Sequence, residues 1–252
     1  MTRPAVSRRD EMLREMGIDP RWRLRAAAAG KEAAAAEMPA EPAAGTALQA
    51  PAPLTAAASG PDWEELKARV ASCTACGLHA KRNKTVFGVG DEQADWLFIG
   101  EGPGVDEDEQ GEPFVGQAGK LLDNMLAAID LRRGANVYIA NIVKCRPPGN
   151  RNPEPEEAQA CSSHLQRQIE LLRPKLIVAL GKVAAVNLLG RNASIAALRG
   201  QVHEHRGIPL IVTYHPAYLL RTLNDKAKAW QDLRFAVDTM NGLQAAARAG
   251  AG

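Results

Sequence analysis

The sequence has few of the features that mark membrane and secreted proteins. None of its apolar runs approaches the roughly 20 residues needed to cross a bilayer. The first ten residues contain three arginines and no apolar stretch, so we expect no secretory signal. Four cysteines in 252 residues do not indicate a disulfide scaffold. They indicate either buried thiols or a metal site in a reducing cytoplasm.

An excess of charge is also missing, because the net charge is only +2. Overall charge therefore does not identify a polyanionic partner, and any nucleic-acid binding must come from local basic patches. The length suffices for one globular domain with residues to spare.

Composition divides the chain into four parts. Residues 26–60 are dominated by Ala, Pro, Glu and Gly, which is typical of a flexible linker. Residues 1–25 contain one short helical pattern, interpreted either as a disordered tail or as a peptide that docks on a protein partner or on DNA. Residues 61–241 are predicted to form the folded, catalytic domain. The small residues at the end predict a flexible tail over 242–252.

Strand-like and helix-like segments alternate in the folded part. Four helices are expected. The helical spacing of apolar residues predicts one over Leu121–Ile129, and the others are expected over Glu154–Leu172, from the third strand to Leu189, and over Asp225–Met240. The apolar runs predict strands over Trp96–Ile99, Val137–Ala140, Lys175–Gly181 and Pro209–Tyr214. This alternation predicts an α/β fold with a mainly parallel sheet covered on both faces. Ligands then bind at the carboxyl ends of the strands, in the loops after Ile99, Ala140 and Tyr214.

The cysteines come from two distant segments. Cys73 and Cys76 form a close pair before the first strand, and Cys145 and Cys161 follow the second strand. Four thiolates suit a tetrahedral zinc ion or an iron–sulfur cluster, and spacing does not separate the two metals. The alternative is that Cys145 and Cys161 are merely buried thiols. A zinc deaminase is excluded, because the His-x-Glu order that it needs beside a Cys-x-x-Cys is missing.

The first strand leads into a glycine-rich loop, Gly100–Gly104, followed by four consecutive acidic residues. The spacing of its glycines does not fit a dinucleotide-binding fingerprint, and the carboxylates would repel a pyrophosphate. Phe114 lies in a second glycine-rich stretch, where an aromatic ring can stack on a base. Asn141 ends the second strand with an amide that can either read a base edge or cap a loop. His215 follows the fourth strand, where a histidine can either bind a ligand or have a purely structural role.

These residues together resemble family 4 uracil-DNA glycosylases. The similarity covers about residues 63–240 and is carried by the four cysteines and by three motifs: Gly100-Glu-Gly-Pro-Gly104 with the stretch up to Leu122, Asn141 to Pro153, and His215 to Arg221. The resemblance implies a three-layer α/β/α sandwich with a four-stranded parallel sheet. It also implies a structural [4Fe–4S] cluster held by Cys73, Cys76, Cys145 and Cys161, which decides iron over zinc.

The resemblance also suggests roles in the removal of a flipped-out uracil. Phe114 would stack on the base, and Asn141 would bind its polar edge, with backbone amides around Gly102 and Gly104. His215 would donate to O2 of the leaving uracil. Glu107, with Glu101 or Asp108, would position the water. The expected DNA contacts are Arg146, Arg151, Leu219 and Arg221, with Leu220 and the basic residues Lys81, Arg82 and Lys84 as further candidates.

Two alternative functions stay open on the sequence. One is a glycosylase for another deaminated base, and the other is a non-catalytic iron–sulfur module that binds DNA. Binding alone would not need Glu101, Glu107, Asn141 and His215 together, which favours an enzyme. The expected partner is uracil-containing DNA, single- or double-stranded. We expect a monomeric, bacterial cytoplasmic protein that contacts no membrane.

Overall fold

The computed structural model describes residues 60–250, and every statement below concerns that range. The predictions for the docking segment 1–25 and for almost all of the linker 26–60 lie outside the described residues. No helix in the described range combines the length and the apolar character that a membrane span requires.

The centre of the fold is a six-stranded sheet with the order β1-β3-β2-β4-β6-β5. Its four central strands are parallel and almost entirely buried, which explains their continuous apolar runs. The prediction of four strands is wrong, because two short antiparallel strands extend the edges. Their polar or glycine-containing sequences carry no apolar run that would have revealed them. The strands are β1 (Val89–Gly90), β2 (Trp96–Gly100), β3 (Val137–Asn141), β4 (Leu176–Leu180), β5 (His203–His205) and β6 (Ile208–Thr213).

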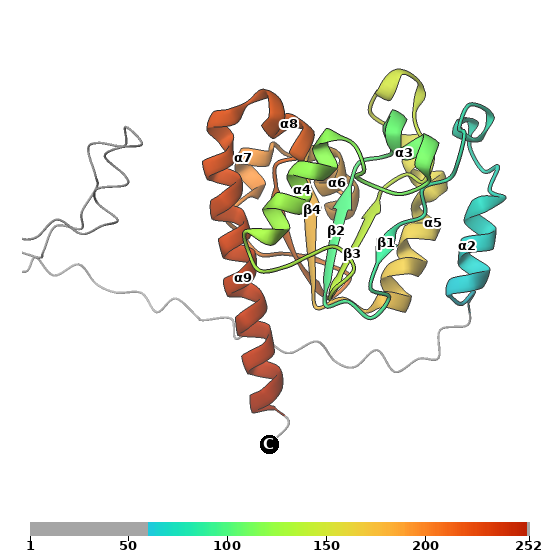
Figure 1. Ribbon diagram of the computed structural model, residues 1–252. Helices are drawn as coiled ribbons and strands as arrows, with labels where there is room; N and C mark the ends of the chain where they lie inside the picture. Colours follow the sequence, from blue (N-terminus) through green and yellow to red (C-terminus); the bar gives the residue numbers. More distant parts are fainter. Residues whose placement is uncertain (1–59, 251–252) are drawn as a thin grey trace, which may run out of the picture. The chain divides into compact units, whose positions relative to one another are not determined.

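Helices cover both faces of the sheet, so the predicted three-layer α/β/α sandwich is confirmed (Figure 1). One core joins alternate strand residues to α5 and α6, and the other joins the remaining strand residues to α4, α8 and α9. The helices are α2 (Trp63–Ala71), α3 (Val105–Gln110), α4 (Gln117–Ala127), α5 (Pro155–Leu172), α6 (Lys182–Leu189), α7 (Ile195–Leu198), α8 (Pro216–Arg221) and α9 (Lys226–Ala249), with short 3₁₀ turns at Gly77–Ala80, Pro148–Asn150 and Leu223–Asp225.

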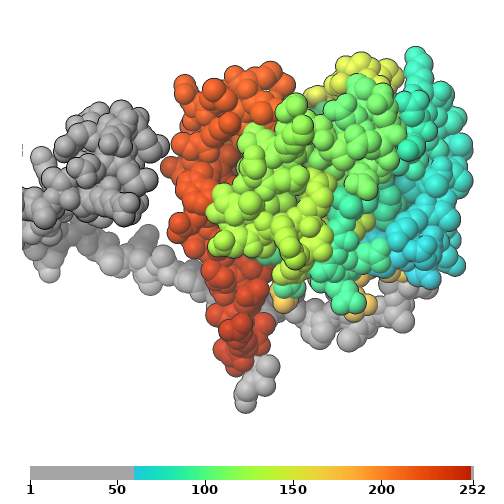
Figure 2. All heavy atoms as spheres, in the orientation of Figure 1, coloured from blue at the N-terminus to red at the C-terminus, as the bar shows by residue number. Residues whose placement is uncertain are grey.

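The last helix is longer than the sequence pattern indicated. Helix α9 runs to Ala249, so the prediction of a flexible tail beginning at residue 242 is wrong over most of that segment. Alanine has the highest helix propensity of all residues, and this favours continuation of the helix where apolar periodicity fades. The end of α9 projects beyond the sheet in Figure 1 and extends away from the other coloured residues in Figure 2, and its side chains are mostly exposed.

Candidate functional site

The carboxyl ends of the parallel strands place the predicted site residues at one edge of the sheet. Gly100 at the end of β2 is in register with Asn141 at the end of β3. His215 follows β6 and begins helix α8, and Gly181 after β4 donates its amide to Thr213 O at 2.8 Å. The loops that the sequence singled out after β2, β3 and β6 therefore meet at the same edge.

Phe114, Asn141 and His215 surround the end of β2. The Phe114 and His215 rings lie 5.5 Å apart between centroids. A Cβ atom added at Gly100 would lie 2.5 Å from both Asn141 Oδ1 and Phe114 Cζ, so glycine is needed for these side chains to approach. Asn141 is 2% exposed, and its Oδ1 accepts no hydrogen bond from the described residues. A buried acceptor without a partner is costly, which points to a ligand that supplies the donor.

The Phe114 ring is held by a strained backbone that other residues stabilise. Phe114 has a φ of 56°, a left-handed value that non-glycine residues rarely adopt. Arg133 donates to Pro113 O at 2.7 Å and to Phe114 O at 2.8 Å. A Cβ at Gly119 would collide with the Phe114 carbonyl, so this position requires glycine. Sequence reasoning missed Arg133, because nothing in its local pattern relates it to a loop that lies nineteen residues earlier.

His215 has a defined tautomer and is neutral. Ala217 N donates to His215 Nδ1 at 3.2 Å, which assigns the ring proton to Nε2. Burial, assisted by the positive charge of Arg221 and partly opposed by Glu107, lowers the pKa of His215 to about 4. At neutral pH the ring is therefore an uncharged donor through Nε2. Gly181, with a φ of 92°, lets the backbone pass close to the His215 side chain.

Glu107 joins three loop segments through its carboxylate. Its Oε1 accepts from Val115 N at 2.9 Å and from Gly116 N at 3.1 Å, and its Oε2 accepts from Gly104 N at 3.0 Å. Both oxygens therefore hold the glycine-rich loop, the start of α3 and the Phe114 loop in one arrangement. The amide of Gly104, expected to bind uracil, is already occupied by this bond. Gly102 instead packs on Val143, whose Cγ2 would lie 2.8 Å from a Cβ added there.

The other two carboxylates considered for positioning the water molecule, those of Asp108 and Glu101, differ in burial and in hydrogen bonding. Asp108 is almost fully buried and accepts hydrogen bonds from Asn83 N, Asn83 Nδ2 and Lys84 N, so it anchors the segment after the first cysteine pair. Glu101 is partly buried, and burial alone raises the pKa of its carboxyl group, whose oxygens accept no hydrogen bond and form no ion pair among the described residues. Glu101 is therefore the carboxylate that is free to bind a water molecule.

The structure alters the expected DNA contacts. Leu219 is 1% exposed and packs in the core, so its predicted role as a wedge in DNA is wrong. The exposed leucines of this region are Leu220 and Leu223, at 42% and 62%. A helix presents successive residues to different sides, so only one of the adjacent leucines can face the core. Arg221 is exposed, as a phosphate contact requires.

Two arginines that were expected to contact DNA form hydrogen bonds with other side chains of the protein. Arg151 makes a bidentate pair with Glu157 at 2.8 and 2.7 Å, which organises the start of α5. Arg146 donates to Asn150 Oδ1 at 2.7 Å and remains partly exposed. Arg82, also considered for phosphate binding, turns instead toward the cysteines.

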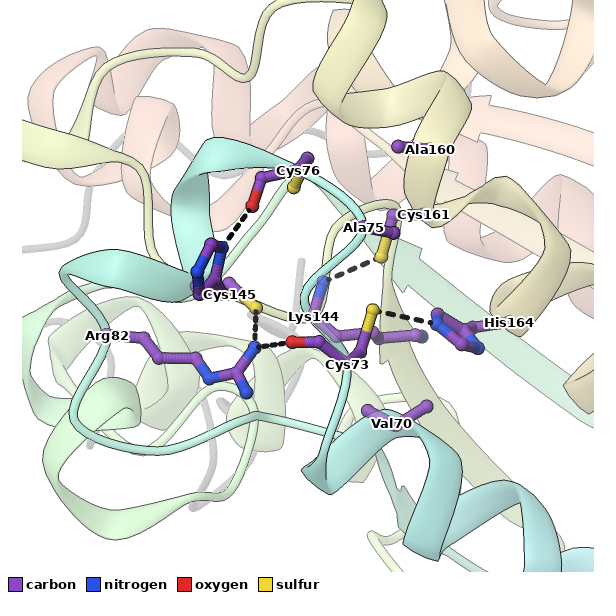
Figure 3. A pocket seen from close by; sticks show the side chains of 11 residues that line it. Val70, Cys73, Ala75, Cys76, Arg82, Lys144, Cys145, Ala160, Cys161 and His164 are labelled. Carbon is purple, nitrogen blue, oxygen red and sulfur yellow. Dashed lines mark hydrogen bonds between the residues drawn. The ribbon is translucent and has the colours of Figure 1, made fainter.

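The four cysteines line one pocket, as the sequence predicted, and their sulfur atoms lie around a common space (Figure 3). Nitrogen atoms of the protein approach three of the sulfurs. Arg82 Nη1 lies 3.1 Å from Cys145 Sγ, Lys144 N lies 3.3 Å from Cys161 Sγ, and His164 Nε2 lies 3.3 Å from Cys73 Sγ. Such bonds stabilise thiolates over thiols and are typical of metal-bound cysteines.

The pocket does not have the geometry of a single metal ion. No group of three or more His, Cys, Asp or Glu side chains within residues 60–250 converges closely enough to hold one ion. Burial raises the pKa of Cys161 to about 11, partly offset by the positive charge of Lys144. Protein atoms alone thus leave this sulfur protonated at neutral pH, whereas a bound metal would deprotonate it.

The polar residues around the sulfurs were not identified as such from the sequence. Arg82 also donates to Cys73 O at 2.8 Å and to Ala71 O at 3.0 Å, so it joins the two cysteine segments. Lys144 and His164 each lie within three residues of a cysteine. That proximity was the available signal, but it did not indicate which side chains turn inward.

Comparison with known proteins agrees with this geometry. Residues 87–234 match the Uracil DNA glycosylase superfamily. The Type-4 uracil-DNA glycosylase of Archaeoglobus fulgidus is 47% identical over 165 residues, covering 62% of this chain and 82% of that protein. The corresponding protein of Thermotoga maritima is 46% identical over 167 residues, covering 66% and 86%. A Type-5 uracil-DNA glycosylase of Thermus thermophilus is 32% identical over 155 residues, covering 52% and 68%. The chain therefore belongs to the uracil DNA glycosylase superfamily and, within it, to the type-4 family.

Proposed function

We infer that this protein is a uracil-DNA glycosylase, which hydrolyses the N-glycosidic bond of deoxyuridine in DNA and leaves an abasic site for repair. The observation that carries this function is the buried, unpartnered Asn141 Oδ1 beside the Phe114 ring and the neutral His215. This arrangement offers a stacking surface, an acceptor and a donor to one flat polar ring.

Recognition begins when the nucleotide flips out of the stack, since its glycosidic bond is inaccessible in a duplex. Phe114 then stacks on the base, and Asn141 accepts the N3–H through Oδ1 and donates to O4 through Nδ2. Cytosine presents an acceptor at N3 and a donor at N4 on the same edge. Asn141 Oδ1 would then face an acceptor, and Asn141 Nδ2 would face a donor. Leaving buried polar groups unpaired is the strongest means of rejecting an analogue.

Bond cleavage leaves negative charge on the uracil and positive charge on the sugar. The Nε2–H of His215 donates to uracil O2, where the negative charge develops. Glu101 orients the attacking water through its unpaired carboxylate, and its charge stabilises the cationic sugar. Glu107 acts as a positioning residue, because both of its oxygens are bonded to the loop amides.

We propose that Cys73, Cys76, Cys145 and Cys161 hold a structural [4Fe–4S] cluster. Four sulfur atoms around one space suit a cluster, which is larger than a single ion and needs more widely separated ligands. When bound, the cluster cross-links the cysteine pair before the sheet to the segment that follows β3. The N–H groups of Arg82, Lys144 and His164 would then stabilise its sulfurs.

The DNA lies across the edge of the sheet where β2, β3 and β6 end. Arg221 and Arg146 contact phosphates, and the exposed Leu220 and Leu223 fill the space left by the flipped nucleotide. We propose that both single- and double-stranded DNA are substrates and that the protein acts in the cytoplasm.

The direct test is incubation with labelled oligonucleotides that contain a single uracil, thymine or hypoxanthine, followed by alkaline cleavage. We expect cleavage only at uracil. Cleavage at hypoxanthine but not at uracil would support a glycosylase for another base. No cleavage of any oligonucleotide by iron-loaded protein that still binds DNA would favour the non-catalytic module.

A further inference from the structure

Lys144 lies between the base-reading residue Asn141 and the cysteine pocket. It is 1% exposed and is among the largest fully buried side chains of the described range. Its Nζ donates to the backbone oxygen of Asn141 at 2.9 Å, at the end of β3. Its backbone N–H approaches Cys161 Sγ at 3.3 Å, and its backbone oxygen accepts from Val86 N at 2.8 Å. One residue thus bonds directly to both sites.

The charge of Lys144 has no balancing carboxylate within residues 60–250. Burial opposes its charged form, and no carboxylate among the described residues offsets that cost. The same pocket is lined by a second cation, Arg82, and by His164. A buried ammonium normally requires a nearby negative charge and several acceptors. Nζ has only one acceptor here, so the pocket lacks negative charge when protein atoms alone are counted.

The group proposed for the pocket would supply that charge. A cluster bound by four thiolates is an anion overall, and its potential responds to nearby charges and hydrogen bonds. The same pocket wall that holds the cysteines also holds the Lys144 side chain (Figure 3). The buried cation is therefore placed where an anionic cluster would offset its cost.

We propose that Lys144 is a positioning residue that couples the cluster to base recognition. Its ammonium balances the negative charge of the thiolate-bound cluster, and its hydrogen bond to Asn141 O fixes the strand end from which the Asn141 amide reads the base. This inference rests on the proposed function, because it assumes both the cluster and the uracil pocket. No other described side chain hydrogen-bonds to Asn141 while its own backbone bonds to a cysteine sulfur.

The neutral variants Lys144→Met and Lys144→Gln separate the role of Lys144 in balancing the cluster charge from its role as hydrogen-bond donor to Asn141 O. Methionine removes both the charge and the donor, whereas glutamine removes the charge and retains a donor. Lys175→Met is the matched control, because Lys175 pairs with Asp95 on the surface, beside the amino end of β4. The proteins are purified with iron bound, and glutamine provides the second neutral variant should the methionine variant not fold.

Three quantities are compared: the midpoint potential of the cluster, the rate of iron release to a chelator, and the dissociation constant for free uracil. Removing a nearby positive charge disfavours adding an electron, so we expect both Lys144 variants to lower the potential and to release iron faster than Lys175→Met. We expect Lys144→Met to bind uracil about tenfold more weakly, as for loss of one charged hydrogen bond, and Lys144→Gln to recover part of that loss.

Values for both Lys144 variants equal to those of Lys175→Met would show that Lys144 only fills space, and would overturn the proposal. A wild-type protein that binds iron but excises no uracil would refute the proposed function instead. In that case the midpoint potentials would still decide whether Lys144 balances the charge of the cluster.

Discussion

The proposed uracil pocket, formed by Phe114, Asn141, His215 and Glu101, differs from the cysteine pocket, formed around Cys73, Cys76, Cys145 and Cys161. The difference lies in whether their polar groups have hydrogen-bond partners. In the uracil pocket, Asn141 Oδ1 and the Glu101 carboxylate have no partner within the described range, and His215 uses only Nδ1. In the cysteine pocket, nitrogen atoms of the protein already lie within hydrogen-bonding distance of three of the four sulfurs. Unpaired groups are costly in a stable interior but necessary for a ligand that enters and leaves. This difference is the one expected if the first site takes the proposed exchangeable substrate and the second holds the proposed permanent structural cluster.

The two pockets also depend on different parts of the chain. The uracil pocket uses the ends of β2, β3 and β6, which the sheet brings together by register. The cysteine pocket joins the segment after α2 to the region between β3 and α5 through Arg82 and the sulfurs. The first should therefore tolerate the loss of one side chain without unfolding, while the second should not.

The largest expected effect is on catalysis, from His215→Ala. Loss of the donor to uracil O2 should reduce the excision rate by about a thousandfold while DNA binding is retained. His205→Ala on edge strand β5 is the control and should leave the rate unchanged. Single-turnover excision and DNA binding by anisotropy measure the two quantities. An unchanged rate in His215→Ala would remove His215 from the mechanism.

Next in size is the effect of Cys161→Ser on the cysteine pocket. We expect iron content to fall and the free energy of unfolding to drop by several kcal/mol, since a metal site that links distant segments contributes to folding. Iron analysis and thermal denaturation would measure this. The adjacent exposed Ser162→Ala variant should behave as wild type. Normal stability without iron would mean that the cysteines are only buried thiols.

A pH effect on stability should arise from the uracil pocket. The pKa of His215 is about 4 in the folded protein and 6.5 in the unfolded chain, so the unfolded state binds more protons between these values. This contribution to stability is complete above pH 6.5 and is lost as pH falls toward 4. It is on the order of 3 kcal/mol. Comparing the thermal stability of the wild-type protein with that of His215→Gln between pH 4 and 6.5 isolates the contribution of His215. Parallel curves would contradict the low pKa.

A smaller effect is expected from Arg133→Ala, which frees the Phe114 loop. Without the two bonds to Pro113 O and Phe114 O, the strained backbone should relax, and uracil affinity should fall about tenfold. The neighbouring exposed Arg132→Ala is the matched control. Inhibition of excision by free uracil provides the measurement. Equal inhibition constants would show that the ring is held by packing alone.

The smallest effect distinguishes two adjacent leucines. Leu220→Ala should leave stability unchanged and slow excision from duplex DNA a few-fold, because the exposed side chain no longer replaces the flipped base. Leu219→Ala should instead destabilise the fold by about 2–5 kcal/mol, as for other buried leucines. Melting temperatures and excision rates on single- and double-stranded substrates test both. An excision defect in Leu219→Ala without destabilisation would reverse the assignment.

The sequence predicted the four central strands because their apolar runs are continuous, as buried parallel strands require. It missed β1 and β5, which are short edge strands without that pattern. It placed Asn141 and His215 at the carboxyl edge of the sheet, because strand ends are visible as the points where apolar runs stop. It did not rank Glu101, Glu107 and Asp108, since acidic residues in one loop region look alike until their hydrogen-bond partners are known.

The sequence by itself determined the sandwich, the edge of the sheet at which the candidate site residues lie and the four cysteines of the proposed cluster site, because periodicity and motifs are local properties of the chain. The tertiary structure decided which groups are occupied and which are free. It buried Leu219 and exposed Leu220, engaged Glu107 and Asp108 while leaving Glu101 unpaired, and turned Lys144 inward between the two pockets. These outcomes depend on contacts between segments far apart in the chain, which no local pattern encodes.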